Sequence, residues 1–283
     1  MRGVILAGGM GTRMAPASQA TNKHLMPVYS DDGAVPMIYY PIRTLVQSGI
    51  TDILIVSSVE HCGHMIETLK DGHEFGADLS YKIQDHNRVV LGIASALKLA
   101  KNFTGGDAFA VVLGDNFFED TFQNLVEDFD QHDDEALVFL KEVKDIQRFG
   151  CATVDGERVT KIVEKPKKPE SNWAVTGLYF YKPSVYEVAE SLKPSKRGEL
   201  EITDINQHFC EEGELGAGFL EGFWSDMGTP ESIMRTQKFI QGCCNGKNGH
   251  AGGSCHESGE VREMRGTCCQ QDTDSFRRRI SER

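Results

Sequence analysis

The sequence predicts an α/β fold, in which a Rossmann-like, mostly parallel sheet is followed by an added antiparallel layer. Three apolar runs, at residues 4–7, 53–56 and 108–113, are too short for helices and suit buried parallel strands. Segments with helical patterns separate these runs, and such alternation indicates right-handed βαβ units. From residue 150 the pattern changes to short strands joined by polar turns, which favours antiparallel pairing.

The other elements can be placed in order along the chain. Residues 36–41 lead into a helix that continues through Val46 and ends at Gly49. Further strands are expected at 79–83, 152–154, 159–163, 175–181 and 218–220, and further helices at 61–69, 93–101, 187–192, 203–212 and 230–240, the last begun by a proline. Ligands of parallel sheets bind beyond the carboxyl ends of the strands, which places residues 8–13, Gln84 and Asp115 on one rim.

Composition and charge limit the classes of partner. Of the 283 residues, 40% are hydrophobic and 25% are charged, as in a globular protein of one large or two modest domains. No run approaches the roughly 18 apolar residues of a membrane span, and the N-terminus is expected to be a strand, without the apolar stretch of a signal peptide. The formal net charge of −12 argues against a nucleic-acid partner. We therefore expect a cytoplasmic protein that binds neither nucleic acid nor a membrane.

Cysteine usage changes near the C-terminal end. Three cysteines (Cys62, Cys151 and Cys210) are scattered and predict inert core thiols, while the other five follow residue 242. Because apolar periodicity ends there, we expect residues 242–283 to form a mostly disordered tail. The alternative is a metal site in this tail, which the absence of a CxxC pair disfavours. Its ligands would come from Cys243, Cys244, His250, Cys255, His256, Cys268 and Cys269.

The first strand ends in a glycine-rich loop. Gly8, Gly9 and Gly11 let the backbone turn sharply and bring bare N–H groups against an anion. Arg13 and Lys23 would add a fork of donors and a point charge around the same phosphates. An ordinary glycine turn is the alternative, and the spacing fits neither the dinucleotide nor the P-loop pattern. The sequence therefore predicts a phosphate loop of another kind.

Two aspartates are the candidate metal ligands. Asp115 follows a buried strand and a glycine, and Asp226 lies in the segment 223–229. A carboxylate at the end of a buried strand is well placed to hold Mg²⁺ against a triphosphate. Each aspartate alone is more often a turn former or a helix cap, so the interpretation depends on the glycine-rich loop as well.

Seven motifs occur in one order along the chain: residues 9–13 with Lys23, then 36–41, 113–116, 164–166, 176–181, 197–204 and 224–229. In this order they resemble the sugar-phosphate nucleotidyltransferases, and specifically the glucose-1-phosphate thymidylyltransferase type. The resemblance covers roughly residues 1–240. It implies that residues 1–241 form a nucleotidyltransferase catalytic domain.

The resemblance implies a reaction between dTTP and glucose-1-phosphate. A phosphate oxygen of the sugar attacks the α-phosphorus, pyrophosphate leaves, and dTDP-glucose forms with Mg²⁺ as cofactor; this step needs positioning and charge neutralisation more than covalent help. The implied nucleotide-binding residues are Leu6, Gly8, Gly9, Gly11, Thr12, Arg13, Gln84, Gly92 and Asp115. The implied catalytic residues are Arg13, Lys23, Asp115 and Asp226, of which Asp115 and Asp226 hold the metal. The implied sugar-phosphate residues are Gly150, Glu164, Lys165, Thr176, Gly177 and Arg197.

Some of these residues have plainer interpretations. Glu164 and Lys165 would also suit a solvated strand end, and Arg197 with Glu201 a surface ion pair. The carboxamide of Gln84 can pair with the edge that thymine and uracil share, or it is only a polar residue at a strand end. We interpret His86 as a loop residue, because attack by a phosphate needs no general base.

Three departures from the family pattern affect regulation and assembly. They are the replaced turn at 30–35, the changed residues 116–120, and the missing C-terminal helices beyond residue 240. Feedback by a nucleotide sugar and the family's tetramer are therefore weaker expectations, although a homo-oligomer remains a candidate. Two rival functions stay open: a UTP-dependent enzyme that makes UDP-glucose, and a non-catalytic regulatory subunit of the same fold. The second is disfavoured because the charged site residues are all present.

Overall fold

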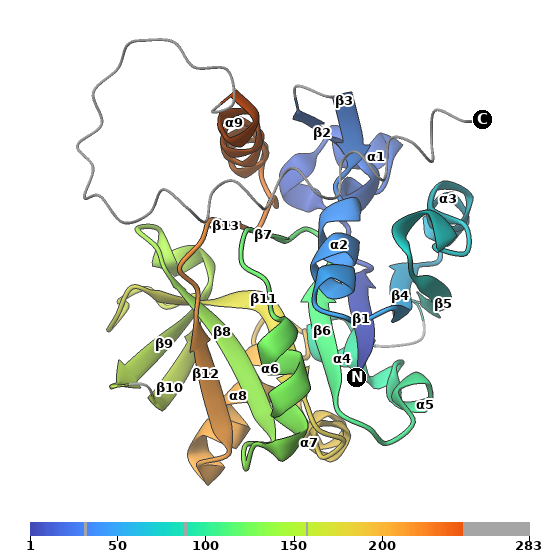
Figure 1. The fold of residues 1–283 in the computed structure, drawn as a ribbon. Helices are drawn as coiled ribbons and strands as arrows, with labels where there is room; N and C mark the ends of the chain where they lie inside the picture. The colour runs from blue at the N-terminus through green and yellow to red at the C-terminus, as the bar shows by residue number, and fades with distance from the viewer. Residues whose placement is uncertain (31–32, 86, 88–89, 157, 246–283) are drawn as a thin grey trace.

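The computed structural model describes residues 1–30, 33–85, 87, 90–156 and 158–245. Within these residues, nine strands form one sheet in the order β10-β9-β11-β6-β1-β4-β5, with β8 beside β11 and β12 beside β8 (Figure 1). Its strands are β1 (Arg2–Ala7), β4 (Asp52–Ser58), β5 (Asp78–Gln84), β6 (Phe109–Leu113), β8 (Ala136–Glu142), β9 (Gly150–Asp155), β10 (Arg158–Glu164), β11 (Trp173–Tyr181) and β12 (Leu215–Phe219).

The sheet has a parallel part and an antiparallel part. Strands β5, β4, β1 and β6 are parallel neighbours, with Val4 opposite both Leu54 and Val111. β11 then pairs antiparallel with β6, and β9 pairs antiparallel with β11 and β10. The α/β class and the antiparallel addition are confirmed, and the added strands continue the parallel sheet edge to edge.

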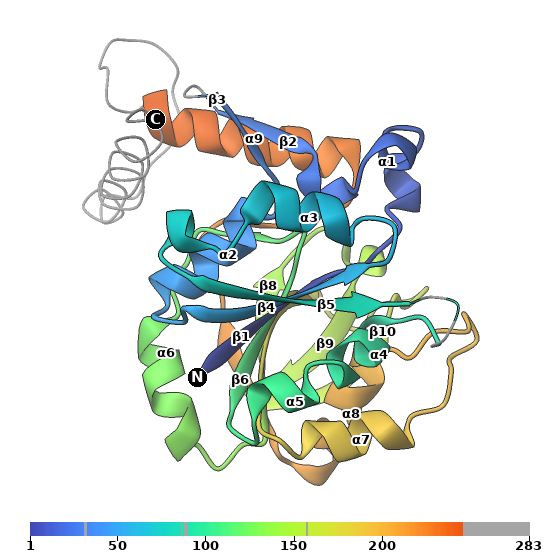
Figure 2. The ribbon, with the colours of Figure 1, turned by 90° about the vertical axis from the view of Figure 1, so that its right-hand side faces the viewer.

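Helices cover both faces of this sheet (Figure 2). One face carries α2 (Tyr39–Gln47), α3 (Cys62–Leu69) and α6 (Gln123–Asp128), and the other carries α4 (Ile93–Lys98), α5 (Lys101–Thr104), α7 (Val185–Ser191) and α8 (Ile202–Glu212). Helix α8 shows why the sequence folds this way: Ile202, Ile205 and Phe209 share one face and are buried. Each such side chain contributes about 1.5–3 kcal/mol on full burial.

A third, smaller core lies beyond the carboxyl ends of the parallel strands. It packs Val28, Met37, Met227 and Ile233 together, and it joins the hairpin of β2 and β3 to the long helix α9 (Figure 2). The elements at this end are β2 (Pro27–Ser30), β3 (Gly33–Pro36), β7 (Phe117–Phe118), β13 (Trp224–Ser225), α1 (Ala17–Ala20) and α9 (Pro230–Asn245). Among the described residues, the short 3₁₀ helices are η1 (Thr12–Met14), η2 (Lys23–Leu25), η3 (His73–Phe75), η4 (Phe129–Gln131) and η5 (Ile146–Arg148).

The structure differs from the sequence-based expectations at several elements. The helix expected at 93–101 is divided into α4 and α5, while β8 and the β2–β3 hairpin were not predicted. Helix α9 continues to Asn245, four residues beyond the expected domain boundary at 241. The tail beyond 245 and His86 lie outside the described residues. The expected thiols are free cysteines, with Cys62 and Cys151 buried and Cys210 half-buried. Among the described helices, none combines the length and the apolar character that a membrane span requires.

Candidate active site

The glycine-rich loop follows β1 and packs against Lys23. Gly11 has φ 62, in the left-handed region that favours glycine, and a Cβ there would lie 3.1 Å from Cβ of Lys23. Arg13 follows within η1, and its half-exposed guanidinium lies 3.9 Å from Oδ2 of Asp226. The loop therefore brings its backbone, a lysine and an arginine to one place.

The remaining predicted loop residues differ in their exposure. Gly9 and Thr12 are exposed, whereas the side chain of Leu6 is buried in the core beneath the loop. The carbonyl of Leu6 accepts a hydrogen bond from the backbone N–H of Gly114. Leu6 thus joins β1 to the turn that carries Asp115.

Lys23 and Asp115 form a nearly buried ion pair. Nζ of Lys23 lies 2.5 Å from Oδ2 of Asp115, and the two side chains are only 12% and 11% exposed. Burial alone would raise the pKa of Asp115, but the neighbouring charges and hydrogen bonds, led by the charge of Lys23 and including the amide of Asn116, together hold this pKa below its usual value. Asp115 is therefore ionised at neutral pH.

His24 anchors the segment that carries Lys23. Its Nδ1 lies 2.6 Å from Oδ1 of Asn22, which also accepts the backbone N–H of His24. Burial, reinforced by the charge of Lys23, lowers the pKa of His24 to about 3. The imidazole is therefore neutral, so Nδ1 carries the proton that it donates to Asn22.

Asn116 joins three parts of the site. Its Nδ2 donates to Oδ1 of Asp115 at 2.9 Å, and its Oδ1 accepts Nε1 of Trp224 at 2.7 Å and the N–H of Gly177 at 3.2 Å. Gly177 lies on β11, and Trp224 lies two residues before Asp226. This buried amide thus ties the two aspartates to a predicted sugar-site residue.

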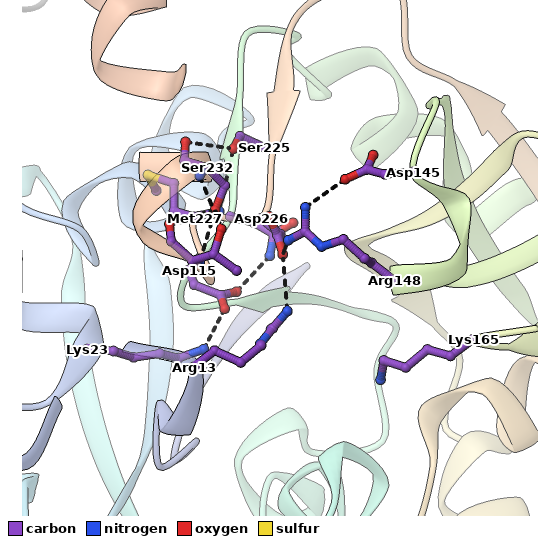
Figure 3. Close-up of polar contacts among 12 residues, drawn as sticks. Arg13, Lys23, Asp115, Asp145, Arg148, Lys165, Ser225, Asp226, Met227 and Ser232 are labelled. Carbon is purple, nitrogen blue, oxygen red and sulfur yellow. Dashed lines mark hydrogen bonds and ion pairs between the residues drawn. The ribbon is translucent and has the colours of Figure 1, made fainter. Parts of the chain in front are cut away.

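Asp226 is held by arginines on one oxygen only (Figure 3). Nη2 of Arg148 donates to Oδ2 of Asp226 at 2.8 Å, while Oδ1 is buried and has no hydrogen-bond partner among the described residues. Figure 3 shows Arg13 and Lys23 on one side of the two aspartates, with Arg148 and Lys165 on the other. Positive charge therefore faces the carboxylates from two sides.

Gln84 ends β5 on the same rim. It is 5% exposed, and its Nε2 is buried without a hydrogen-bond partner in the described part of the chain. A Cβ at Gly8 would lie 2.8 Å from Oε1 of Gln84, so the loop and the carboxamide are adjacent. An unpaired buried donor is costly, which makes this amide a candidate ligand contact.

Gly92 begins α4 against the backbone of Leu200. Its φ is 121, and a Cβ there would come within 2.2 Å of the Leu200 carbonyl oxygen. Leu91 pairs with Glu199 in a parallel bridge beside this contact. The segment after Gln84 is thus fastened to the loop that carries Arg197.

The charged residues predicted to bind the sugar phosphate form ion pairs with one another and with Glu201. Lys165 contacts Glu164 at 2.5 Å, and Arg197 contacts Glu164 at 3.6 Å and Glu201 at 3.3 Å. The side chains of Lys165 and Arg197 are 43% and 48% exposed. Burial raises the pKa of Glu201. Arg197 and Glu201 do form the predicted ion pair, although Glu201 itself is buried.

The floor of this region is more deeply buried. Oγ1 of Thr203 donates to Oε2 of Glu164 at 2.6 Å, and a Cβ at Gly150 would lie 3.7 Å from the same oxygen. Thr176 is 1% exposed, and its Oγ1 has no partner among the described residues. Gly150, Glu164 and Thr203 therefore converge, and Thr176 offers an unpaired hydroxyl nearby on β11.

Sequence comparison identifies the family. A family model described as nucleotidyl transferase matches residues 2–242, most of the chain. The chain belongs to the nucleotidyl transferase family. Among curated relatives, a glucose-1-phosphate thymidylyltransferase of Neisseria meningitidis is 41% identical over 254 residues, which are 88% of this chain and 86% of that protein.

Two solved structures resemble this nucleotidyl transferase in fold. One is named as a glucose-1-phosphate thymidylyltransferase from Bacillus anthracis with sucrose bound; it has a TM-score of 0.79 and 44% identity, and the match covers 85% of this chain and 95% of that chain. A UDP-glucose pyrophosphorylase complexed with UDP-glucose has a TM-score of 0.72 at 21% identity, with 84% and 97% covered. At that identity, the second likeness shows the shared fold alone.

The two aspartates of the nucleotidyl transferase fit a magnesium ion. Their donors are carboxylate oxygens, and the buried, unpaired Oδ1 of Asp226 is an acceptor that a cation would satisfy. Among the described residues there is no group of three or more histidines, cysteines and acidic residues that could hold a metal. Mg²⁺ commonly uses one or two carboxylates and completes its shell with waters and substrate phosphates, so two aspartates suffice.

Sequence reasoning missed three contributors to this site. Arg148, Thr203 and Asn116 contact predicted site residues, yet each belongs to a different segment. Asn116 and Thr203 lie inside the motifs 113–116 and 197–204, so a closer reading of those motifs would have singled them out. Arg148 lies 78 residues before Asp226, and no local pattern in the sequence marks it.

Proposed function

We propose that this protein transfers a thymidylyl group from dTTP to glucose-1-phosphate, which yields dTDP-glucose and pyrophosphate. The proposal is supported by relatives about 40% identical that are named glucose-1-phosphate thymidylyltransferase. It is also supported by the buried, unpaired amide of Gln84 at one end of the site and by Glu164, held by Thr203, at the other. The observation that carries it is the buried, unpaired Nε2 of Gln84 beside the glycine-rich loop.

In the proposed reaction, the residues divide by substrate. The loop at 8–13 and Arg13 hold the triphosphate, and Lys23 stabilises the negative charge on the transferring phosphoryl group. An oxygen of the sugar phosphate forms a new bond to the α-phosphorus, and the bond to the bridging oxygen of pyrophosphate breaks. No proton need move, because the attacking phosphate oxygen is already ionised.

On the sugar side, Glu164 accepts hydrogen bonds from sugar hydroxyls, with Thr203 fixing its orientation at 2.6 Å. Lys165 contacts the sugar phosphate, and Arg197 closes over the phosphates. Gly150 and Gly177, which have no side chains, would lie beneath the sugar ring. These contacts hold the attacking oxygen in line with the leaving group.

We assign Asp115 and Asp226 as the residues that would hold Mg²⁺. The ion, when bound, offsets charge on the phosphate oxygens in the transition state. Lys23 holds Oδ2 of Asp115 in place and keeps that carboxylate ionised. The metal requirement itself is part of the proposal.

UTP is the second candidate nucleotide. Oε1 of Gln84 can accept N3–H of the base and Nε2 can donate to a carbonyl oxygen, and thymine and uracil offer the same edge. The two nucleotides then differ by one methyl group and one hydroxyl group, each worth about 10–200-fold in discrimination. We therefore propose that dTTP is preferred and that UTP is still used.

Product formation tests the proposal. With Mg²⁺, dTTP and glucose-1-phosphate, the full-length protein should release one pyrophosphate for each dTDP-glucose formed, as measured by chromatography with a coupled pyrophosphate assay. A non-catalytic subunit would form neither product. A cytoplasmic location and a homo-oligomer remain proposals from the sequence.

A further inference from the structure

Arg148 is a charged side chain in the site to which the proposed reaction assigns no role. It ends η5, between β8 and β9, and its guanidinium packs over the ring of Phe149 at 5.0 Å. Nη1 donates to Oδ2 of Asp145 at 2.7 Å, and Nη2 donates to Oδ2 of Asp226 at 2.8 Å (Figure 3). A planar guanidinium held at three sides has little freedom to turn.

The contact with Arg148 makes the two carboxylate oxygens of Asp226 differ in their hydrogen bonding. Oδ2 accepts the short, charge-assisted bond and also faces Arg13 at 3.9 Å. Oδ1 is buried and has no hydrogen-bond partner among the described residues. At Asp115, by contrast, Lys23 contacts one oxygen and Asn116 the other.

This asymmetry has an energetic consequence. A buried acceptor without a partner costs about 1–3 kcal/mol, and more when it is charged. The carboxylate of Asp226 could relieve that cost by rotating, but rotation would break the bond to Arg148. Arg148 therefore keeps the unsatisfied oxygen in one orientation.

We infer that Arg148 is a positioning residue that reserves Oδ1 of Asp226 for the divalent cation. The inference rests on the proposed function, because it takes Asp226 as a ligand of the metal that accompanies the triphosphate. Asp145 acts one step further away, since it orients the guanidinium without contacting Asp226 in the structure. Residues that hold a metal ligand in place typically change metal affinity by 10–100-fold when they are removed.

The affinity gain that the metal gives to nucleotide binding is the quantity to measure. Isothermal titration would give Kd for dTTP with EDTA and Kd for dTTP with excess Mn²⁺, in the absence of sugar phosphate so that no turnover occurs. Kd with EDTA divided by Kd with Mn²⁺ gives the factor by which the metal strengthens nucleotide binding, and this ratio is the quantity compared between variants. In Arg148→Gln this ratio should fall about 10-fold, while Kd for metal-free dTTP stays within about twofold.

Three further variants sharpen the test. Arg148→Lys and Asp145→Asn should lower the ratio less than Arg148→Gln, because each keeps a cation beside Asp226. Lys161→Gln is the control: Lys161 lies on β10, outside the site, and the change removes its 2.8 Å ion pair with Glu170, so the ratio should stay unchanged. Melting temperatures of all variants check the fold, and the two milder variants serve if Arg148→Gln does not fold.

Each outcome separates the inference from its alternatives. An unchanged or larger ratio in Arg148→Gln would overturn the inference. So would weaker binding of metal-free dTTP with an unchanged ratio, which would make Arg148 a direct phosphate contact. A wild-type protein that binds no Mn²⁺–dTTP at all would instead remove the proposed function, and the inference with it.

Discussion

The proposed nucleotide side and the proposed sugar side of the candidate site are built differently. On the nucleotide side, Lys23 and Asp115 are already paired in a nearly buried position, and Gln84 is buried beside the loop. On the sugar side, Lys165 and Arg197 are half exposed and form ion pairs with neighbouring carboxylates. If the proposed roles hold, the nucleotide site is preformed, whereas the ion pairs of the sugar site must be exchanged for contacts with the substrate.

The largest effect should follow from the two aspartates. Asp115→Asn and Asp226→Asn should each lower kcat at least about 100-fold, or about 2.7 kcal/mol in the barrier, because each change weakens a proposed metal ligand. The folds should survive, since each change is nearly isosteric. Steady-state kinetics with varied Mg²⁺ measure this. Substantial Mg²⁺-dependent activity in both variants would remove the metal assignment.

A smaller and more selective effect is expected at Lys165. Lys165→Ala should raise KM for glucose-1-phosphate about 10-fold, which corresponds to about 1.4 kcal/mol. KM for dTTP should change less than about twofold, because the role proposed for Lys165 is on the sugar side only. Lys167→Ala, an exposed neighbour, is the matched control. Equal increases in both KM values would contradict the division into two sides.

A separate effect concerns the stability of the fold and its dependence on pH, not activity. Folding lowers the pKa of His24 from 6.5 to about 3, so between these values the unfolded chain binds more protons than the folded chain. Stability contributed by the neutral imidazole is present above pH 6.5 and is lost as pH falls toward 3, with a slope of up to about 1.4 kcal/mol per pH unit.

Urea unfolding of the wild type and of His24→Gln at several pH values between 6.5 and 5 would measure this slope. The carboxyl groups of Glu201 and Asp204, whose pKa values burial raises, contribute equally in both proteins and cancel in the difference. His24→Gln should show the shallower dependence. Parallel curves would contradict a neutral, buried His24.

The fold could be predicted from the sequence where the residues that specify an element lie close together along the chain. The apolar run at 4–7 and the glycines after it lie next to each other, so a strand and its loop follow from a few residues. The same holds for β6 and Asp115. The run 136–140 carried the same apolar signal, yet β8 was not predicted, and its parallel pairing with β12 depends on residues 75 or more positions away.

The site was predictable to the extent that motifs marked it. Gln84 and Gly8 are adjacent because β5 and β1 lie in the same parallel part of the sheet. The sequence predicts such a sheet but does not give the order of its strands. The bond from Arg148 to Asp226 spans 78 residues and joins the end of the short helix η5 to the segment after β13, so no periodicity could reveal it. Long-range side-chain pairs need the strand order and the register first.

Nucleotide selectivity tests the preformed nucleotide side most directly. The measurement is kcat/KM for dTTP, UTP, CTP and ATP with glucose-1-phosphate, in the wild type and in Gln84→Ala. We expect dTTP to be preferred, UTP to follow within about 100-fold, and CTP and ATP to be very poor. Gln84→Ala should weaken dTTP and UTP together and narrow their gap to CTP. A preference for ATP, or selectivity unchanged in Gln84→Ala, would contradict the role given to Gln84.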